Sequence, residues 1–167
     1  MYKFQVKDTG CPDVLMVLVN YEDRVVTRQQ KSTIIRMGMR SCVDADFEKE
    51  YRYSISHTDR YSVAVLSKEC KVGIDIEKKS NITKRSEGLD MLFPRDCSIS
   101  PTIRWCLHEV IGKIESTGLN VYYPILSCEH LPDQKLCVCY GKADREQRVE
   151  IEFLENAEYV MVLGYAR

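Results

Sequence analysis

Apolar and polar positions in the first half of the chain predict several strands and one helix. Residues 14–19 form an apolar run of strand length, and residues 22–39 mix apolar and polar positions in a helical manner. Three further segments are rich in Tyr, Val and Ile and are separated by short polar stretches, namely residues 51–56, 61–67 and 72–77. We expect these three segments to form an antiparallel meander.

The second half repeats this order of elements after a polar stretch at residues 78–101. Four residues that break regular structure fall in this stretch: Asn81, Gly88, Pro94 and Pro101. A helix is expected over residues 101–117, where Gly118 ends it. Strands are then expected over residues 135–140, 148–154 and 159–165.

This order of elements predicts an α+β fold built as a pseudo-dimer of two similar halves. The halves are residues 1–80 and 81–167, each a helix packed on a three-stranded, mainly antiparallel sheet, and together they form one compact unit. The duplication is inferred from the order of elements alone, because no sequence repeat is visible. A chain of 167 residues is long enough to bury a sizeable core in this arrangement.

The charge balance and the apolar runs narrow the class of partner. The chain has 24 basic and 25 acidic side chains, a formal net charge of -1, so general nucleic-acid binding is not favoured and any anion site must be local. No apolar run approaches the roughly 18 residues of a membrane span, and the N-terminus lacks the apolar core of a signal peptide. We expect a cytoplasmic protein that binds neither nucleic acid nor membrane.

Eight cysteines raise the question of a disulfide or zinc framework, but their spacing argues against both, because the chain has no Cys-x-x-Cys pair. Free thiols of this kind usually behave as small buried apolar groups. The one zinc arrangement that the sequence offers is Cys106-x-His108 with Cys97 or Cys128, whose ligands would come from separate elements without a recognised knuckle.

The helix expected from Pro101 has one apolar face and one face of mixed chemistry. Its apolar face follows the three-and-four spacing of a buried stripe: Ile103, Leu107, Val110, Ile111 and Ile114. On the other face Lys113 lies one turn from Glu109, which is also the pattern of an ordinary ion pair on a solvated helix. Trp105 and Gly112 on this face instead favour the close approach of a ligand.

The segment Gly73-Ile74-Asp75-Ile76-Glu77 predicts a pair of carboxylates on one face of a strand. Side chains alternate with period two, so Asp75 and Glu77 point the same way while Ile74 and Ile76 face the core. Two such ligands, with Glu109 as a third, suit Mg²⁺ bound together with substrate phosphates. A solvent-facing strand edge would have the same pattern, and His57 alone is equally consistent with a turn or capping residue.

Three ordered blocks resemble the 4'-phosphopantetheinyl transferase superfamily in its two-halved, surfactin-type branch. Tyr53-Ser54-Ile55-Ser56-His57-Thr58 is similar to the family's Phe-Asn-Ile/Leu-Ser-His-Ser/Thr block, and Gly73, Asp75 and Glu77 fit its Gly-x-Asp-x-Glu block. The third block, Trp-x-x-Lys-Glu-x-x-x-Lys-x-x-Gly-x-Gly-Leu, is matched at Trp105, Glu109, Lys113, Gly118 and Leu119. It departs at two positions, His108 for the first lysine and Ser116 for the first glycine.

The resemblance implies transfer of 4'-phosphopantetheine from coenzyme A to a serine of an apo acyl or peptidyl carrier protein, releasing adenosine 3',5'-bisphosphate. By the same resemblance, Asp75, Glu77 and Glu109 would hold Mg²⁺, and Glu109 would also act as the catalytic base. Lys113 would stabilise the leaving oxygen, and His57 would contact the 3'-phosphate of coenzyme A. The internal duplication implies a monomer.

Departures from the family pattern add further expectations and an alternative. His108 would take the phosphate contact of the missing lysine, and Lys49 and Arg52 are the available substitutes for an absent Gly-Lys-Pro block. These departures also fit a catalytically degenerate relative that binds coenzyme A or a carrier protein as an interaction module. A small structural α+β domain is the third reading, and it must attribute the three ordered blocks to chance.

Overall fold

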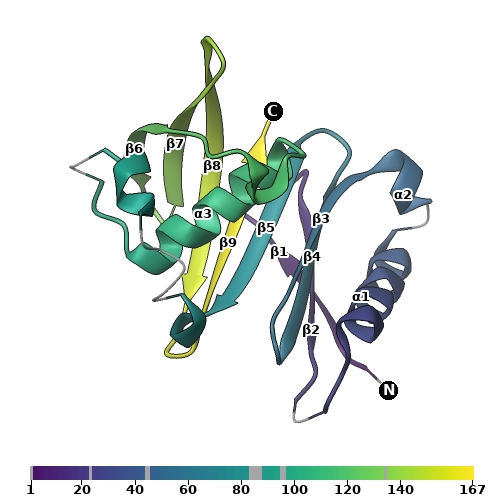
Figure 1. The fold of residues 1–167 in the computed structure, drawn as a ribbon. Helices are drawn as coiled ribbons and strands as arrows, with labels where there is room; N and C mark the ends of the chain where they lie inside the picture. Colours follow the sequence, from purple (N-terminus) through teal and green to yellow (C-terminus); the bar gives the residue numbers. More distant parts are fainter. Residues whose placement is uncertain (1, 23, 44–45, 83–87, 95–96, 134) are drawn as a thin grey trace.

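The computed structural model describes residues 2–22, 24–43, 46–82, 88–94, 97–133 and 135–167 as an α+β structure with two antiparallel sheets and few helices (Figure 1). The first sheet has the order β1-β2-β4-β3, and the second has the order β5-β9-β8-β7-β6. The strands are β1 (Phe4–Asp8), β2 (Leu15–Asn20), β3 (Arg52–His57), β4 (Tyr61–Ser67), β5 (Lys71–Lys78), β6 (Ile125–Leu131), β7 (Lys135–Lys142), β8 (Arg145–Glu155) and β9 (Tyr159–Ala166). The α-helices are α1 (Arg28–Cys42), α2 (Phe47–Glu50) and α3 (Pro101–Ile114), with short 3₁₀ turns at Lys79–Asn81, Leu89–Leu92 and Gly118–Asn120.

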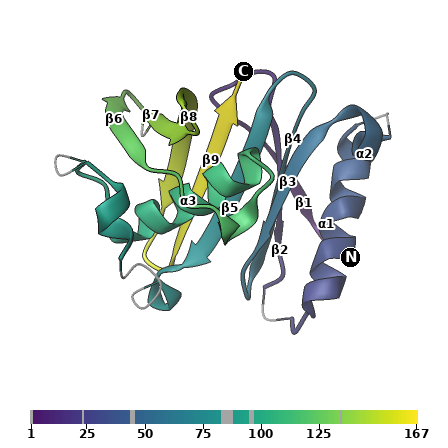
Figure 2. The same ribbon diagram turned by 45° about the horizontal axis from the view of Figure 1, so that its top comes forward.

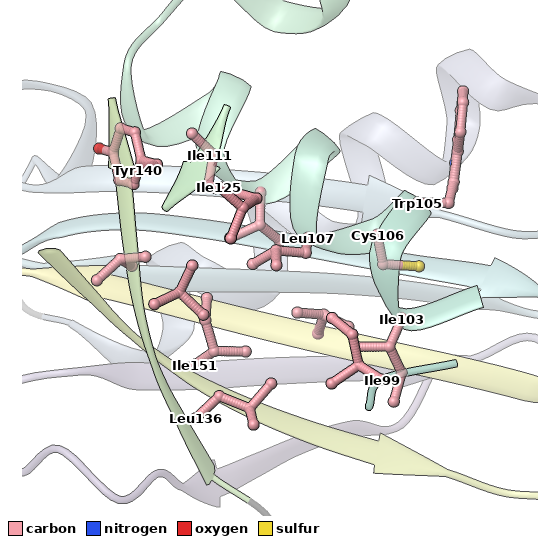
Figure 3. Close-up of a cluster of buried hydrophobic side chains, with 14 of the residues drawn as sticks. Ile99, Ile103, Trp105, Cys106, Leu107, Ile111, Ile125, Leu136, Tyr140 and Ile151 are labelled. Atoms are coloured by element: carbon pink, nitrogen blue, oxygen red, sulfur yellow. The ribbon is translucent and has the colours of Figure 1, made fainter. Parts of the chain in front are cut away.

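The two sheets lie back to back, and each carries one long helix on its outer face (Figures 1 and 2). Helix α1 packs on β2 and β4 through a cluster that includes Ile35 and Ala64. Helix α3 packs on β5 and β9 through a second cluster (Figure 3). A third cluster, which includes Val63 and Ile74, fills the space between the sheets. The resulting order of layers is helix, sheet, sheet, helix.

Helix α1 begins later than the sequence pattern suggested. Thr27 forms a capping box with Gln30, in which each side chain accepts a hydrogen bond from the other residue's backbone N–H. The expected start at Glu22 is wrong, because Glu22 has a φ of 54°, outside the helical region. The end is also later, at Cys42 rather than residue 39.

Helix α3 confirms the predicted buried stripe, because Ile103, Leu107, Val110, Ile111 and Ile114 are all buried. Ser100 caps its N-terminus by accepting from the Ile103 N–H, and Pro101 occupies the first turn. The helix ends at Ile114 rather than at residue 117.

The expectation that Trp105 and Gly112 mark a ligand-facing side of this helix is wrong. Trp105 is buried as a member of the hydrophobic cluster around α3, at the margin of the group in Figure 3. A Cβ atom on Gly112 would lie 2.2 Å from the carbonyl oxygen of Gly118. Gly112 therefore makes room for the turn that follows α3, not for a ligand.

The expected three-stranded meander is wrong in its last strand. β5 does not pair with β4; it crosses to the second sheet and pairs with β9. The sheets therefore have four and five strands instead of three each, and the chain passes between them after Ser67, ahead of the expected division at residue 80. The sequence pattern missed β1 and β6 because most of their side chains are exposed and neither segment contains a long apolar run.

Among the described residues, no helix is both long enough and apolar enough to cross a membrane.

Candidate functional site

A cavity of about 450 Å³ lies where β3 and β5 meet helices α1 and α3. The sequence analysis singled out three of the segments that line it, namely the His57 block on β3, the Asp75 segment on β5, and the Glu109 and Lys113 stretch on α3. The structure brings these three segments together. Its lining comprises Arg28, Lys31, Ile55, Ser56, His57, Thr58, Asp75, Glu77, Glu109 and Lys113.

Two serines hold β3 beside β5 although the strands belong to different sheets. The Ile74 N–H donates to Ser54 Oγ at 3.1 Å, and the Ile76 N–H donates to Ser56 Oγ at 3.3 Å. β5 is the edge strand of its sheet, so these hydroxyls satisfy backbone donors that no neighbouring strand pairs. The serines of the His57 block thus fix the position of the Asp75 strand.

Asp75 is the most buried acidic group of the cavity, with 3% of its surface exposed. Its Oδ1 accepts from Ser56 Oγ at 2.9 Å and from Lys113 Nζ at 3.0 Å. Lys113 Nζ also donates to the Ile74 carbonyl at 2.7 Å. The Cys106 thiol also hydrogen-bonds to the Asp75 carboxylate. Among the described residues, no nitrogen or oxygen donor reaches the other oxygen, Asp75 Oδ2, which is buried.

Gly73 lets helix α3 approach the strand that carries Asp75. A Cβ atom at this position would lie 2.5 Å from the Val110 carbonyl oxygen, a distance that packed atoms do not tolerate. Ile74 and Ile76 point to the opposite face, into the cluster between the sheets, as the alternation predicted. In the Gly-x-Asp-x-Glu segment, the glycine therefore allows α3 to pack against β5, and the two carboxylates lie beside α3.

The three predicted metal ligands line one cavity, but they do not form a closed cluster. Among the described residues, the ligand atoms that gather within 4.8 Å of one another belong to Cys11, Asp13 and Cys70, not to the cavity carboxylates. The buried, unpartnered Asp75 Oδ2 fits a cation, since a buried carboxylate oxygen without a partner is energetically costly. Hard oxygen donors of this kind are the ligands that Mg²⁺ takes.

His57 lies at the end of β3 with its ring turned toward the core of the first sheet. His57 Nδ1 is 2.7 Å from Ser62 Oγ, which in turn is 2.6 Å from the Tyr21 hydroxyl. Burial lowers the pKa of His57 to about 4, and the cations Arg28, Lys31 and Lys113 contribute to the same shift. The imidazole is therefore neutral near pH 7, and the neighbouring cations make the potential at the ring favourable for an anion.

Arg28 and Lys31 line the cavity but were missed by the sequence analysis. Lys31 Nζ donates to the carbonyls of Thr58 at 2.5 Å and of Asp59 at 2.8 Å, and burial lowers its pKa. The signal that could have revealed them is two basic residues three apart within the predicted helix, a spacing that places both on one face.

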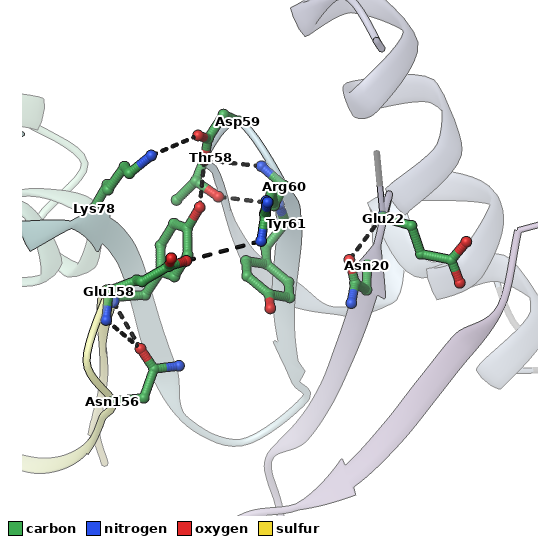
Figure 4. A network of polar contacts seen from close by, with 10 residues as sticks. Asn20, Glu22, Thr58, Asp59, Arg60, Tyr61, Lys78, Asn156 and Glu158 are labelled. Carbon is green, nitrogen blue, oxygen red and sulfur yellow. Dashed lines mark hydrogen bonds and ion pairs between the residues drawn. The ribbon is translucent and has the colours of Figure 1, made fainter. Parts of the chain in front are cut away.

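The turn between β3 and β4 is clamped to the second sheet by a polar network (Figure 4). Asp59 accepts from the Tyr159 hydroxyl at 2.7 Å and from Lys78 Nζ at 3.2 Å. Arg60 lies 3.9 Å from Glu158. Because Lys31 binds carbonyls of the same turn, the network fixes the cationic side of the cavity relative to the strand that carries Asp75.

The structure does not bring His108, Lys49 or Arg52 to the cavity. His108 points into the core, where its ring centroid lies 5.3 Å from that of Phe93, and burial lowers its pKa to about 4. It cannot serve as the expected phosphate contact, because α3 turns this position away from the cavity.

Lys49 and Arg52 are also misplaced for the expected role. Lys49 pairs with Asp46 at 3.0 Å on the exposed side of α2. Arg52 donates to the Glu69 carbonyl, at the end of β3 opposite to His57. The cations that line the cavity besides Lys113 come from α1, namely Arg28 and Lys31.

A scan against protein-family models matches none to this chain, and a search of curated proteins finds no match.

Proposed function

We propose that the chain transfers 4'-phosphopantetheine from coenzyme A to a serine of an apo acyl or peptidyl carrier protein. The observation that supports this function is that His57, Asp75, Glu77, Glu109 and Lys113, from three separated segments, line one cavity. The cavity thus combines carboxylates that could hold a metal with cations that could bind phosphates. The proposal rests on these residues together with the resemblance of the three sequence blocks.

Asp75, Glu77 and Glu109 are the residues that would hold Mg²⁺ in this cavity, and Asp75 Oδ2 is the oxygen that most needs a cation. When bound, Mg²⁺ would supply charge neutralisation at the diphosphate of coenzyme A.

The other residues that line the cavity would bind phosphate and transfer one proton. Arg28 and Lys31 offer positive charge, and the neutral His57 offers the ring nitrogen that does not face Ser62. Lys113 stabilises the oxygen that leaves with adenosine 3',5'-bisphosphate. Glu109, one helical turn away on α3, takes the proton from the carrier serine hydroxyl as the new phosphodiester bond forms.

The proposed function includes a pseudo-dimeric organisation within one chain. Helix α1 covers the first sheet and α3 covers the second, and the cavity lies between these two units. A monomer then contains a complete site, and the proposed location is the cytoplasm, where carrier proteins and coenzyme A would be its partners.

A second candidate is a module that binds coenzyme A or a carrier protein without transferring anything. Two observations favour it: the three carboxylates do not form a closed metal-binding cluster, and the ion pair with Lys113 already neutralises Asp75. In this case the cavity binds an anion through Arg28 and Lys31 and needs no metal.

Intact-mass spectrometry of an apo carrier protein, incubated with this chain, coenzyme A and Mg²⁺, separates these candidates. Transfer predicts a phosphopantetheine-sized mass gain that is lost with a chelator and in Glu109→Gln. The control variant Glu146→Gln, exposed on β8 away from the cavity, retains the gain. If several carriers gain no mass while coenzyme A still binds, the transferase is refuted and the binding module stands.

A further inference from the structure

Two buried thiols and a carboxylate meet at a place remote from the cavity. Cys11 Sγ, Cys70 Sγ and a carboxylate oxygen of Asp13 all lie within 4.8 Å of one another. Both cysteines are buried, with 3% and 0% of their surface exposed, whereas Asp13 lies at the surface. The three residues come from the β1–β2 turn and the β4–β5 turn, which are far apart in the sequence.

Both turns are fixed by their own hydrogen bonds, so the backbone that carries the ligand residues is held in place before any ligand arrives. In the β1–β2 turn, the Val14 N–H donates to the Cys11 carbonyl at 3.0 Å, and Thr9 Oγ1 accepts from the Cys11 N–H at 3.3 Å. In the β4–β5 turn, Ser67 Oγ accepts from the Cys70 N–H at 2.9 Å. Preorganisation of this kind reduces the ordering cost of binding.

A cation already lies against these three groups. Arg167 Nη2 is 3.5 Å from Asp13 Oδ2, and hydrogen bonds to Cys11 and Cys70 raise the pKa of the Arg167 guanidinium. The Arg167 side chain is 75% exposed, so it can turn aside at little cost. The arrangement therefore attracts positive charge to one point shared by two sulfurs and an oxygen.

We propose that Cys11, Cys70 and Asp13 form a binding site for one zinc-type divalent ion. Zinc takes tetrahedral thiolate and carboxylate ligands with a Zn–S distance of about 2.3 Å, which places two sulfurs of one site about 3.8 Å apart. The observed spacing is within about 1 Å of that value, so side-chain rotation closes the site. Thiolate ligands select zinc over magnesium, so this site is distinct in chemistry from the cavity carboxylates.

The number of protons released and the net charge of the site follow from its three ligands. Each thiol loses one proton to solvent as its sulfur bonds the metal, so two protons are released for each ion bound. Two thiolates and one carboxylate around a divalent ion carry a net charge of -1, which Arg167 neutralises from its displaced position. The fourth position of the tetrahedron is left for water.

An entry path and a structural consequence follow from the location. Cys11 and Arg167 also line an open cavity of about 520 Å³, which gives an ion access from solvent. The ion joins the β1–β2 turn to the turn where the chain passes from the first sheet to the second. Metal binding is therefore expected to stabilise the contact between the sheets.

Titration of the reduced chain with Co²⁺, a spectroscopic substitute for zinc, tests the site. We expect one Co²⁺ per chain, a thiolate-to-cobalt charge-transfer band, release of two protons, and loss of the band on addition of Zn²⁺. Cys70→Ser should abolish tight binding, and Asp13→Asn should keep the band but weaken affinity by about tenfold or more.

Two control variants separate this site from others in the chain. Cys137→Ser alters another thiol of the neighbouring cavity, and Asp75→Asn alters the proposed magnesium site; neither should change the band. Absence of a band, or loss of the band in Cys137→Ser with retention in Cys70→Ser, overturns the proposal. If Cys70→Ser does not fold, the exposed Asp13→Asn decides, because unchanged affinity in that variant also overturns it.

Discussion

Replacing Lys113 with methionine removes the cation that neutralises Asp75 in the cavity. Lys113 Nζ lies 3.0 Å from Asp75 Oδ1, with the lysine side chain 24% exposed and the aspartate side chain 5% exposed. Methionine keeps the length of the aliphatic chain, so packing changes little. The variant leaves a buried carboxylate whose hydrogen bonds from the Ser56 hydroxyl and the Cys106 thiol carry no compensating charge.

The size of the effect follows from the distance and burial. Coulomb's law at 3.0 Å with an effective dielectric constant of about 20 gives an attraction of about 5.5 kcal/mol. Desolvation of both groups offsets part of it, and breaking a buried pair from one side usually costs about 3–5 kcal/mol. Because Lys113 is partly exposed, we expect Lys113→Met to lower the free energy of unfolding by about 3 kcal/mol.

A double-mutant cycle measured by urea unfolding isolates the pair. Trp105 is the chain's single tryptophan and is buried, so its fluorescence reports unfolding. Asp75→Asn combined with Lys113→Met should be less destabilised than the sum of the single variants, with a coupling energy of about 2–4 kcal/mol. Additivity within about 0.5 kcal/mol would show that the two groups do not interact as the structure indicates.

Three further outcomes are expected. Burial lowers the pKa of His108 to about 4, while an unfolded imidazole titrates near 6.5, so the unfolded chain binds the proton first as the pH falls. The His108 contribution to stability is therefore lost between about pH 6.5 and 4, by about 3 kcal/mol. His108→Leu should remove this part of the slope of the urea-midpoint profile and leave the part that comes from His57, whose pKa is also lowered to about 4. Arg28→Ala removes a cation near His57 and should raise the pKa of that imidazole, as should added adenosine 3',5'-bisphosphate, measured by NMR of the ring protons. Gly73→Ala forces a Cβ against the Val110 carbonyl and should lower stability by about 1–3 kcal/mol in urea unfolding.

For each of these three predictions, one experimental result would contradict the expected outcome. A His108→Leu profile that keeps the wild-type slope would place the titration elsewhere, and an unchanged His57 pKa in Arg28→Ala would separate that arginine from the cavity. Gly141→Ala is the matched control for the glycine, because its Cβ would meet Pro124 Cγ at 3.3 Å, a side-chain atom. Equal losses in both glycine variants would contradict the packing role of Gly73.

Local sequence patterns were sufficient to predict which faces of α3 and β5 are buried. The three-and-four spacing of Ile103 through Ile114 predicted the buried face of α3, because apolar side chains at that period share one side of a helix. Period-two alternation likewise predicted that Ile74 and Ile76 face the core while Asp75 points away from them. Elements with strong apolar patterns were found, whereas β1 and β6, which are mostly exposed, were not.

The sequence by itself determined the α+β class, the buried stripe of α3 and the side on which Asp75 and Glu77 project, because each depends on backbone periodicity within one segment. Only the tertiary structure decided that β5 leaves the first sheet, that Arg28 and Lys31 add cations to the cavity, and that His108 is buried. These features depend on contacts between residues distant in the chain, such as the Ser54 and Ser56 bridges to β5. Local periodicity carries no information about which remote segment will satisfy a given polar group.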